Sequence, residues 1–242
     1  MKIDVKGKVE SAYVEAPFDQ ALNALKEEKY NLISLEENAR LRMQEGKDSF
    51  ISQNGNYVQE GVIYLPSKEI YLTKISPIIQ NAQSATECHR KGNEFYLNKS
   101  QAEKALKNAV KFPKNSNYEI PTSEFGNDAI TDFAFGKIAK DYGTFLKEAG
   151  INAMPVWLAN CENKPFARQM WFRRLDDRSV LYGDYRGLDY DGRARGVRDV
   201  SAEGAAQKIS NVESYTPKQI SSALKGLGIK GLEKQILESL RK

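Results

Sequence analysis

The stretch ARQMWFRRLDDRSVLYGDYRGLDYDGRARGVR, residues 167–198, differs in composition from the rest of the chain. It contains eight of the twelve arginines, and residues 166–202 contain no lysine and no glutamate. Lysine and glutamate together fill 44 of the 242 positions, so that about seven would be expected in a segment as long as 166–202. This deficit is too large for chance. The tyrosines, aspartates and glycines found instead point to a surface of unusual chemistry.

Short runs of β-branched and aromatic residues predict strands in the middle and last parts of the chain. ARQMWFRRL (167–175) and RSVLYGD (178–184) can pair across an Asp-Asp-Arg turn, and GRARGVRDV (192–200) is expected to be the last strand. Further strands are expected at MPVWLA (154–159), NYVQEGVIYLP (56–66) and KEIYLTKIS (68–76). With helical segments between them, these strands indicate the α+β class.

Helical periodicity dominates both ends of the chain and one central segment. Pro17 suits a first helical turn, and four apolar residues between positions 18 and 25 share one face of the helix that follows. Residues 128–149 carry a longer apolar stripe, which Asn127 can cap and Gly150 can stop, and such stripes belong to a core. The expected parts are a helical N-terminal extension (1–50), one α+β domain (51–200) and a helical tail packed on that domain (201–242).

Composition argues against several classes of function. No apolar run reaches the roughly 20 residues that span a bilayer, and the N-terminus lacks the apolar core of a signal peptide, so a cytoplasmic location is the default expectation. The two cysteines, Cys88 and Cys161, do not have the spacing of a zinc site, and His89 is the single histidine. We therefore expect no metal, no cofactor and no enzyme chemistry. The formal charge of +4 permits an acidic partner without requiring one.

Three explanations compete for the arginine-rich segment. Strands disfavour Lys and Glu, which explains part of the deficit but not the aspartates and glycines. Bidentate Arg–Asp pairs can staple an irregular sheet together. A patch for a polyanion fits poorly, because seven arginines are balanced by five aspartates within 171–198. What remains is the chemistry of an antibody-like binding surface. The arginines that could instead be structural, pairing with aspartates inside the protein, are called staples here; they are Arg178, Arg186, Arg193, Arg195 and Arg198.

The order of the expected elements resembles a known fold. A strand and a short helix precede YEIPTSEF (118–125), a long helix follows, and three strands close the domain. Pro121-Thr122-Ser123-Glu124 resembles the turn before a helix, and Gly192 to Arg198 the last strand, of C-type lectin-like proteins in the formylglycine-generating-enzyme and bacterial lectin-like branches. The resemblance implies a C-type lectin-like core. The lectin calcium motifs Glu-Pro-Asn and Trp-Asn-Asp are absent from the sequence, so it implies neither calcium nor sugar binding.

Within that fold, the chain is similar to the archaeal variable proteins of diversity-generating retroelements. In that family a reverse transcriptase copies a template with errors at adenines, so that asparagine codons become Tyr, Asp, Ser, Gly or Arg codons but not Lys, Glu, Gln, Met or Trp codons. The resemblance implies a variable region at about 155–200, in which Gln169, Met170 and Trp171 are constant scaffold and the final RGVR is the constant end. It further implies recognition of a protein or cell-surface ligand by a hypervariable face. The candidate outward-facing residues are Arg173, Asp176, Tyr182, Asp184, Tyr185, Asp189, Tyr190 and Asp191.

A nucleic-acid-binding function is the alternative. The stretch ALKGLGIKGLEKQIL (223–237) resembles a helix-hairpin-helix motif, in which glycines allow backbone N–H groups to approach a phosphate. A plain turn between two packed helices, with Gly228 ending the first, explains the same residues. The positions that match the motif are Leu224, Gly226, Leu227, Gly228 and Lys230.

Overall fold

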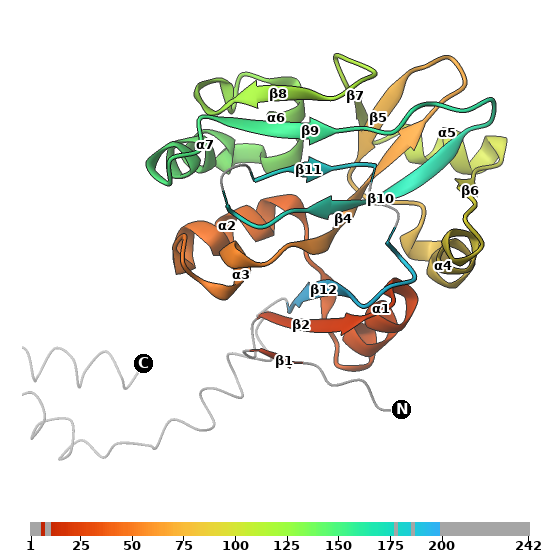
Figure 1. The fold of residues 1–242 in the computed structure, drawn as a ribbon, viewed down its shortest axis with the longest axis horizontal. Coiled ribbons are helices and arrows are strands. Elements are labelled where there is room, and N and C mark those ends of the chain that lie inside the picture. The colour runs from red at the N-terminus through yellow and green to blue at the C-terminus, as the bar shows by residue number, and fades with distance from the viewer. Residues whose placement is uncertain (1–5, 8–10, 177–178, 185–186, 199–242) are drawn as a thin grey trace, which may run out of the picture. The chain divides into compact units, whose positions relative to one another are not determined.

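A computed structural model describes residues 6–7, 11–176, 179–184 and 187–198, and a long central strand organises them (Figure 1). This strand, β4 (Asn56–Tyr64), is buried at every position except Gln59, which is half-buried. It pairs antiparallel with β10 (Phe166–Phe172) and β5 (Ile70–Thr73) and parallel with β12 (Gly192–Val197). Because β4 has neighbours on both edges and cover on both faces, its polar residues Asn56 and Glu60 are buried along with its apolar ones.

All described strands belong to one mixed sheet. Besides β4, β5, β10 and β12 it contains β1 (Lys6–Gly7), β2 (Ser11–Ala16), β3 (Asn31–Leu32), β6 (Phe95–Tyr96), β7 (Ala109–Lys111), β8 (Tyr118–Pro121), β9 (Ala153–Trp157) and β11 (Leu181–Tyr182). Its main order is β1-β2-β12-β4-β10-β11-β9-β8, while β3 pairs with β12, β6 with β10 and β7 with β5. The strands expected at the end of the chain are confirmed, and the hairpin between β10 and β11 forms as predicted.

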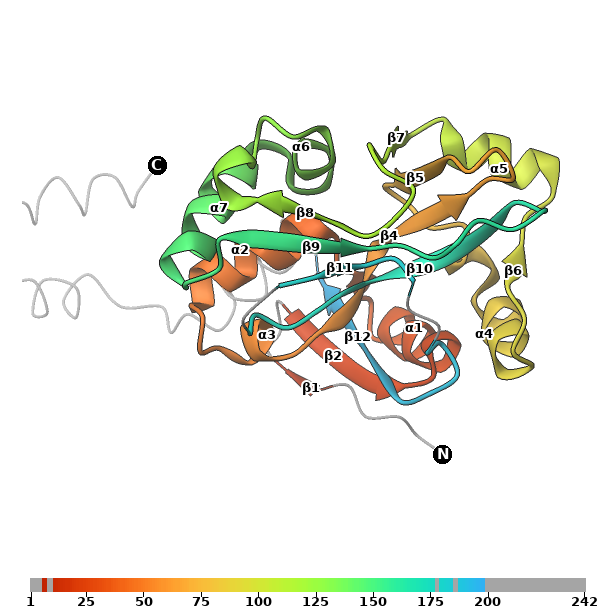
Figure 2. The ribbon, with the colours of Figure 1, turned by 45° about the horizontal axis from the view of Figure 1, so that its top comes forward.

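Helices cover the sheet on both faces and enclose two clusters of apolar side chains. The α-helices are α1 (Phe18–Glu27), α2 (Leu35–Glu45), α3 (Phe50–Gln53), α4 (Ala82–Arg90), α5 (Lys99–Leu106), α6 (Ala129–Phe135) and α7 (Ala139–Glu148), and the 3₁₀ turns are η1 (Ile79–Asn81), η2 (Thr122–Glu124) and η3 (Gly136–Ile138). One cluster is filled from α2, α3, α6 and α7, and the other from α1, α4 and α5. Figure 2 shows α6 and α7 beside β8 and β9, and α1 beside β12.

The helix expected over 128–149 is interrupted. Helix α6 is capped by Asp128 rather than by Asn127, and the side chain of Asp128 accepts two backbone N–H groups of the first turn. The chain then turns at Gly136, where φ is +57° and a Cβ would lie 2.8 Å from Oε2 of Glu36. At this φ any other residue would be strained, and the end of the Glu36 side chain would have to move to make room for it. The stripe itself is confirmed as core, with Ile130, Ala134, Tyr142 and Leu146 buried.

The expectation of a helical N-terminal extension is wrong for two segments. Residues 11–16 form β2, which pairs along its whole length with β12, and residues 31–32 form β3. One edge of β12 lies beside β4. The backbone N–H and C=O groups on the other edge of β12 form hydrogen bonds with β2. The N-terminal strand is therefore part of the main sheet. The predicted tail (201–242) and its helix-hairpin-helix motif lie outside the described residues.

Candidate functional site

The backbone of the arginine-rich segment is held by buried side chains from earlier in the chain. The carbonyl of Arg173 accepts a hydrogen bond from Nη2 of Arg42 over 2.8 Å. The hydroxyl of Tyr64 donates to the Gly183 carbonyl over 3.0 Å, and the hydroxyl of Tyr57 to the Gly187 carbonyl over 2.7 Å. The three donor residues are fully buried. Because every residue type has a carbonyl, these contacts do not depend on which side chains the segment carries.

Arg168 supplies a fourth contact of this kind. Its Nη1 donates to the carbonyl of Asp184, while Nη2 and Nε bind the carboxylate of Glu94 over 2.7 and 3.1 Å. Both Arg168 and Glu94 are buried, so the bidentate pair fixes the guanidinium in place. The local sequence does not reveal these four donors, because their partners lie far along the chain.

Apolar side chains anchor the segment from within. Leu175, Leu181 and Leu188 are buried, as is Phe172 at the end of β10. The backbone N–H of Phe18 donates to the Leu188 carbonyl over 2.8 Å, which joins the turn before β12 to the start of α1. Phe172, Leu175 and Leu181 thus anchor the segment, whereas Trp157 and Trp171 are only partly buried.

The arginines of β12 are staples, but their partners are not aspartates. Arg193 pairs with the carboxylate of Glu15, its register partner on β2, and Nη1 of Arg195 donates to Oγ of Ser11 over 2.6 Å. Arg198 donates to a backbone carbonyl in the turn after α1. The predicted Arg–Asp pairing is wrong here because β2, which the sequence did not reveal as a strand, supplies the facing side chains. The other two candidate staples, Arg178 and Arg186, lie outside the described residues.

A half-exposed cluster of aromatic and charged side chains lies where β9, β11 and β10 meet. Tyr182 on β11 has Trp157 and Trp171 as its register partners, so the three side chains share one face of the sheet. The rings of Tyr182 and Trp157 meet edge to face with centroids 4.8 Å apart. The guanidinium of Arg173 lies 5.7 Å from the Trp157 ring centroid and 3.6 Å from the carboxylate of Asp176. The structure thus brings together three of the predicted residues, Arg173, Asp176 and Tyr182.

Asp184 lies next to this cluster in a partly desolvated position. Its Oδ1 is buried and has no hydrogen-bond partner among the described residues. Burial raises the pKa of this carboxyl group, and the charge of Arg168 opposes the rise. Burial likewise raises the pKa of the Tyr182 phenol, and the nearby Asp184 charge adds to the effect.

The other candidate residues lie in the turn that leads into β12. Tyr190 is 70% exposed, Asp191 is exposed and Asp189 is partly exposed. Tyr57 connects this turn to the cluster on β11, because its ring lies 4.9 Å from that of Trp171 and its hydroxyl binds the Gly187 carbonyl. None of the described candidates is buried, and Tyr185 lies outside the described residues.

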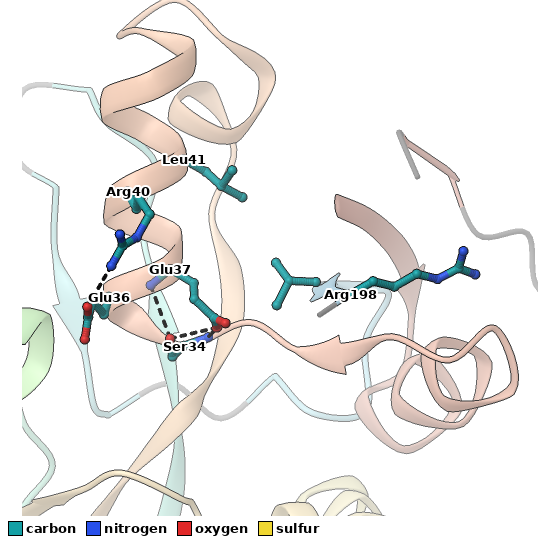
Figure 3. Close-up of a pocket in the computed structure, with 7 residues that line it drawn as sticks. Ser34, Glu36, Glu37, Arg40, Leu41 and Arg198 are labelled. Atoms are coloured by element: carbon teal, nitrogen blue, oxygen red, sulfur yellow. Dashed lines mark hydrogen bonds and ion pairs between the residues drawn. The ribbon is translucent and has the colours of Figure 1, made fainter. Parts of the chain in front are cut away.

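A hollow of about 500 Å³ beside α2 is a weaker candidate (Figure 3). Its polar side chains bind one another: Ser34 and Glu37 form the capping box of α2, and Nη2 of Arg40 lies 2.9 Å from the carboxylate of Glu36. The guanidinium of Arg198 lies 4.2 Å from the centroid of a tyrosine ring. These side chains stabilise the start of the helix and the end of β12, which explains them without a ligand.

Within the part of the chain that the structure describes, no group of three or more His, Cys, Asp or Glu side chains is placed to hold a metal ion. No helix among these residues has both the length and the apolarity needed to cross a membrane. Cys88 and Cys161 are free thiols, and burial raises the pKa of Cys161.

Comparison with known proteins identifies the fold. No protein-family model matches the sequence, and no curated protein matches it. A solved structure, described as the accommodation of massive sequence variation in Nanoarchaeota by the C-type lectin fold, superposes with a TM-score of 0.59. The chain has a C-type lectin fold. The superposition covers 81% of this chain and 98% of the other, and at 14% sequence identity it shows the fold alone.

Proposed function

We propose that residues 155–200 form a hypervariable ligand-binding surface, diversified by a retroelement and displayed on a C-type lectin scaffold. The observation that carries this proposal is the way the segment is held. Buried side chains of Arg42, Tyr57, Tyr64 and Arg168 donate to its backbone carbonyls. Substitutions at its exposed positions therefore leave these bonds in place, and surface changes of this kind cost little stability.

The ligand is a protein or a cell-surface molecule, bound by the cluster around Tyr182 and the turn at 189–191. Both regions combine tyrosine rings with aspartates, and the cluster adds the guanidinium of Arg173. Tyrosine supplies a large amphipathic contact at low entropic cost, as it does in antibody loops. A broad surface of mixed charge suits a macromolecule better than a small metabolite.

A pair of displayed libraries tests the separation of scaffold from surface. The first randomises the exposed Tyr190 and the half-exposed Arg173 and Tyr182, and the second randomises the buried donors Tyr57 and Tyr64. We expect most members of the first library to fold, and selection against unrelated target proteins to yield binders from it. The second library should consist mainly of unfolded chains. Equal loss of folding in the two libraries would contradict the proposal, and so would a folded first library without binders.

The nucleotide sequence around the gene tests the genetic part of the proposal. We expect a near-copy of the codons for residues 155–200 close by, with adenines at the codons of the exposed residues, together with a reverse-transcriptase gene. A locus with neither would remove the retroelement while leaving the ligand-binding surface to be judged by the libraries.

A further inference from the structure

A cavity of about 630 Å³ lies outside the proposed variable region. Its walls come from the end of β5 and the turn that follows, from η1, and from α5 with the residues after it. One hydrogen bond joins β5 to α5, and another joins η1 to the turn before it. The hydroxyl of Thr73 donates to the Ala105 carbonyl over 3.1 Å, and Nδ2 of Asn81 donates to the Pro77 carbonyl over 2.8 Å.

The cavity contains an unusually exposed aliphatic side chain. Ile75 is 58% exposed, and the other large hydrophobic side chains with comparable exposure in the described part of the chain are aromatic. Pro77 and Ala105 add apolar surface to the same cavity. An aliphatic side chain of this size gains about 1.5–3 kcal/mol when a partner removes it fully from water, so the wall favours a ligand with an apolar body.

The charge of the cavity is entirely positive. Its lining includes Lys74, Lys104 and Lys107 and contains neither aspartate nor glutamate. The ammonium group of Lys74 is already engaged, since it donates to the Ala134 carbonyl and lies 5.0 Å from the centroid of a phenylalanine ring. Lys104 and Lys107 are exposed at the C-terminal end of α5 and are the cations available to a ligand.

We propose that this cavity binds a small amphiphilic carboxylate, with its apolar body against Ile75 and its carboxylate at Lys104 and Lys107. The apolar wall and the lysine pair lie at one cavity, which matches the two parts of such a molecule. Amide side chains at its edge, among them Gln80 and Asn108, can donate further hydrogen bonds to the carboxylate. The site is independent of the proposed variable surface, so that one protein would bind a constant small ligand beside a varying macromolecular one.

Calorimetric titration of the full-length chain with decanoate tests the proposal. We expect decanoate to bind, and decanol, which has the same apolar body without the charge, to bind more weakly. The double variant Lys104→Gln/Lys107→Gln should weaken decanoate binding by about threefold to tenfold, since exposed ion pairs contribute modestly. Ile75→Ser should weaken decanoate and decanol alike, by about tenfold. All three substituted side chains are exposed, so the variants should fold as the parent does.

The double variant Lys137→Gln/Lys147→Gln is the matched control, because it removes the same charge from exposed positions outside the cavity. It should bind decanoate as the parent does. The proposal is overturned if decanoate does not bind, if decanol binds as tightly, or if the control weakens binding as much as the Lys104/Lys107 variant. None of these results would bear on the surface at 155–200, whose test is the pair of libraries.

Discussion

Loss of the Tyr57 hydroxyl should weaken the hold on the arginine-rich segment. Tyr57 is fully buried, and its hydroxyl donates to the Gly187 carbonyl over 2.7 Å. Tyr57→Phe keeps the ring and leaves a carbonyl without this donor, at an expected cost of about 1–3 kcal/mol. Tyr190→Phe removes the same group from a side chain that is 70% exposed and should change stability by less than about 0.5 kcal/mol. Tyr64→Phe should cost at least as much as Tyr57→Phe, because the Tyr64 hydroxyl also accepts the N–H of Ala159 over 3.2 Å.

Urea unfolding followed by tryptophan fluorescence measures these differences. Of the two tryptophans of the chain, Trp171 lies within the segment on β10 and Trp157 lies on β9, which pairs with β11 of the segment, so their emission reports on the part of the protein concerned. The midpoint should fall for the two buried variants at an unchanged slope, since the surface exposed on unfolding stays the same. If Tyr57→Phe and Tyr190→Phe proved equally stable, the Tyr57 hydroxyl would not hold the segment, and the proposed separation of a fixed backbone from replaceable surface side chains would be wrong.

Stability should fall as pH rises, because burial raises the pKa of Glu60 to about 8 from 4.5, so the folded state takes up a proton that the unfolded state releases. The contribution of neutral Glu60 to the free energy of unfolding is fully present below about pH 4.5 and is lost as the pH rises to 8. The loss between pH 5 and pH 8 is roughly 3 kcal/mol. Glu60→Gln should therefore flatten the profile of urea midpoints against pH. Arg168→Met removes the guanidinium that pairs with the buried Glu94 carboxylate and should cost about 3–5 kcal/mol by urea unfolding, whereas Arg168→Met/Glu94→Gln should recover much of the loss. Gly192→Val should lower the thermal midpoint, because a Cβ there would lie 2.6 Å from the Tyr57 ring.

Signals carried by neighbouring residues were sufficient for much of the fold. The apolar face of α1 and the strands β10, β11 and β12 follow from local periodicity, and each is found where the pattern places it. The C-type lectin fold rested on the order of such elements together with two short motifs. Local patterns sufficed here because each of these segments buries one continuous face.

Contacts between distant parts of the chain could not be predicted in this way. Strand β2 lies in the part of the chain that was expected to be helical, and its pairing with β12 joins positions nearly the whole described chain apart. The same holds for the bonds from Arg42, Tyr57 and Tyr64 to the arginine-rich segment, since a buried arginine or tyrosine looks like any other in a sequence. The sequence therefore proposed side chains for the candidate site, and the donors that hold its backbone were missed.

Packing accounts for part of the unusual composition of residues 166–202 but not for all of it. Gly192 gives room to the ring of Tyr57, and Arg193 and Arg195 bind side chains of β2, so these residues are explained without diversification. Tyr190 and Asp191 are exposed, and at such positions the rest of this chain freely uses lysine and glutamate. Packing thus explains the absence of lysine and glutamate at the buried positions, and only their absence at the exposed positions supports diversification. Related genes of the same genome should differ at residues 189–191 while keeping Gly192, Arg193 and Arg195. Equal variation at both sets of positions would mean that the composition of the segment does not indicate diversification.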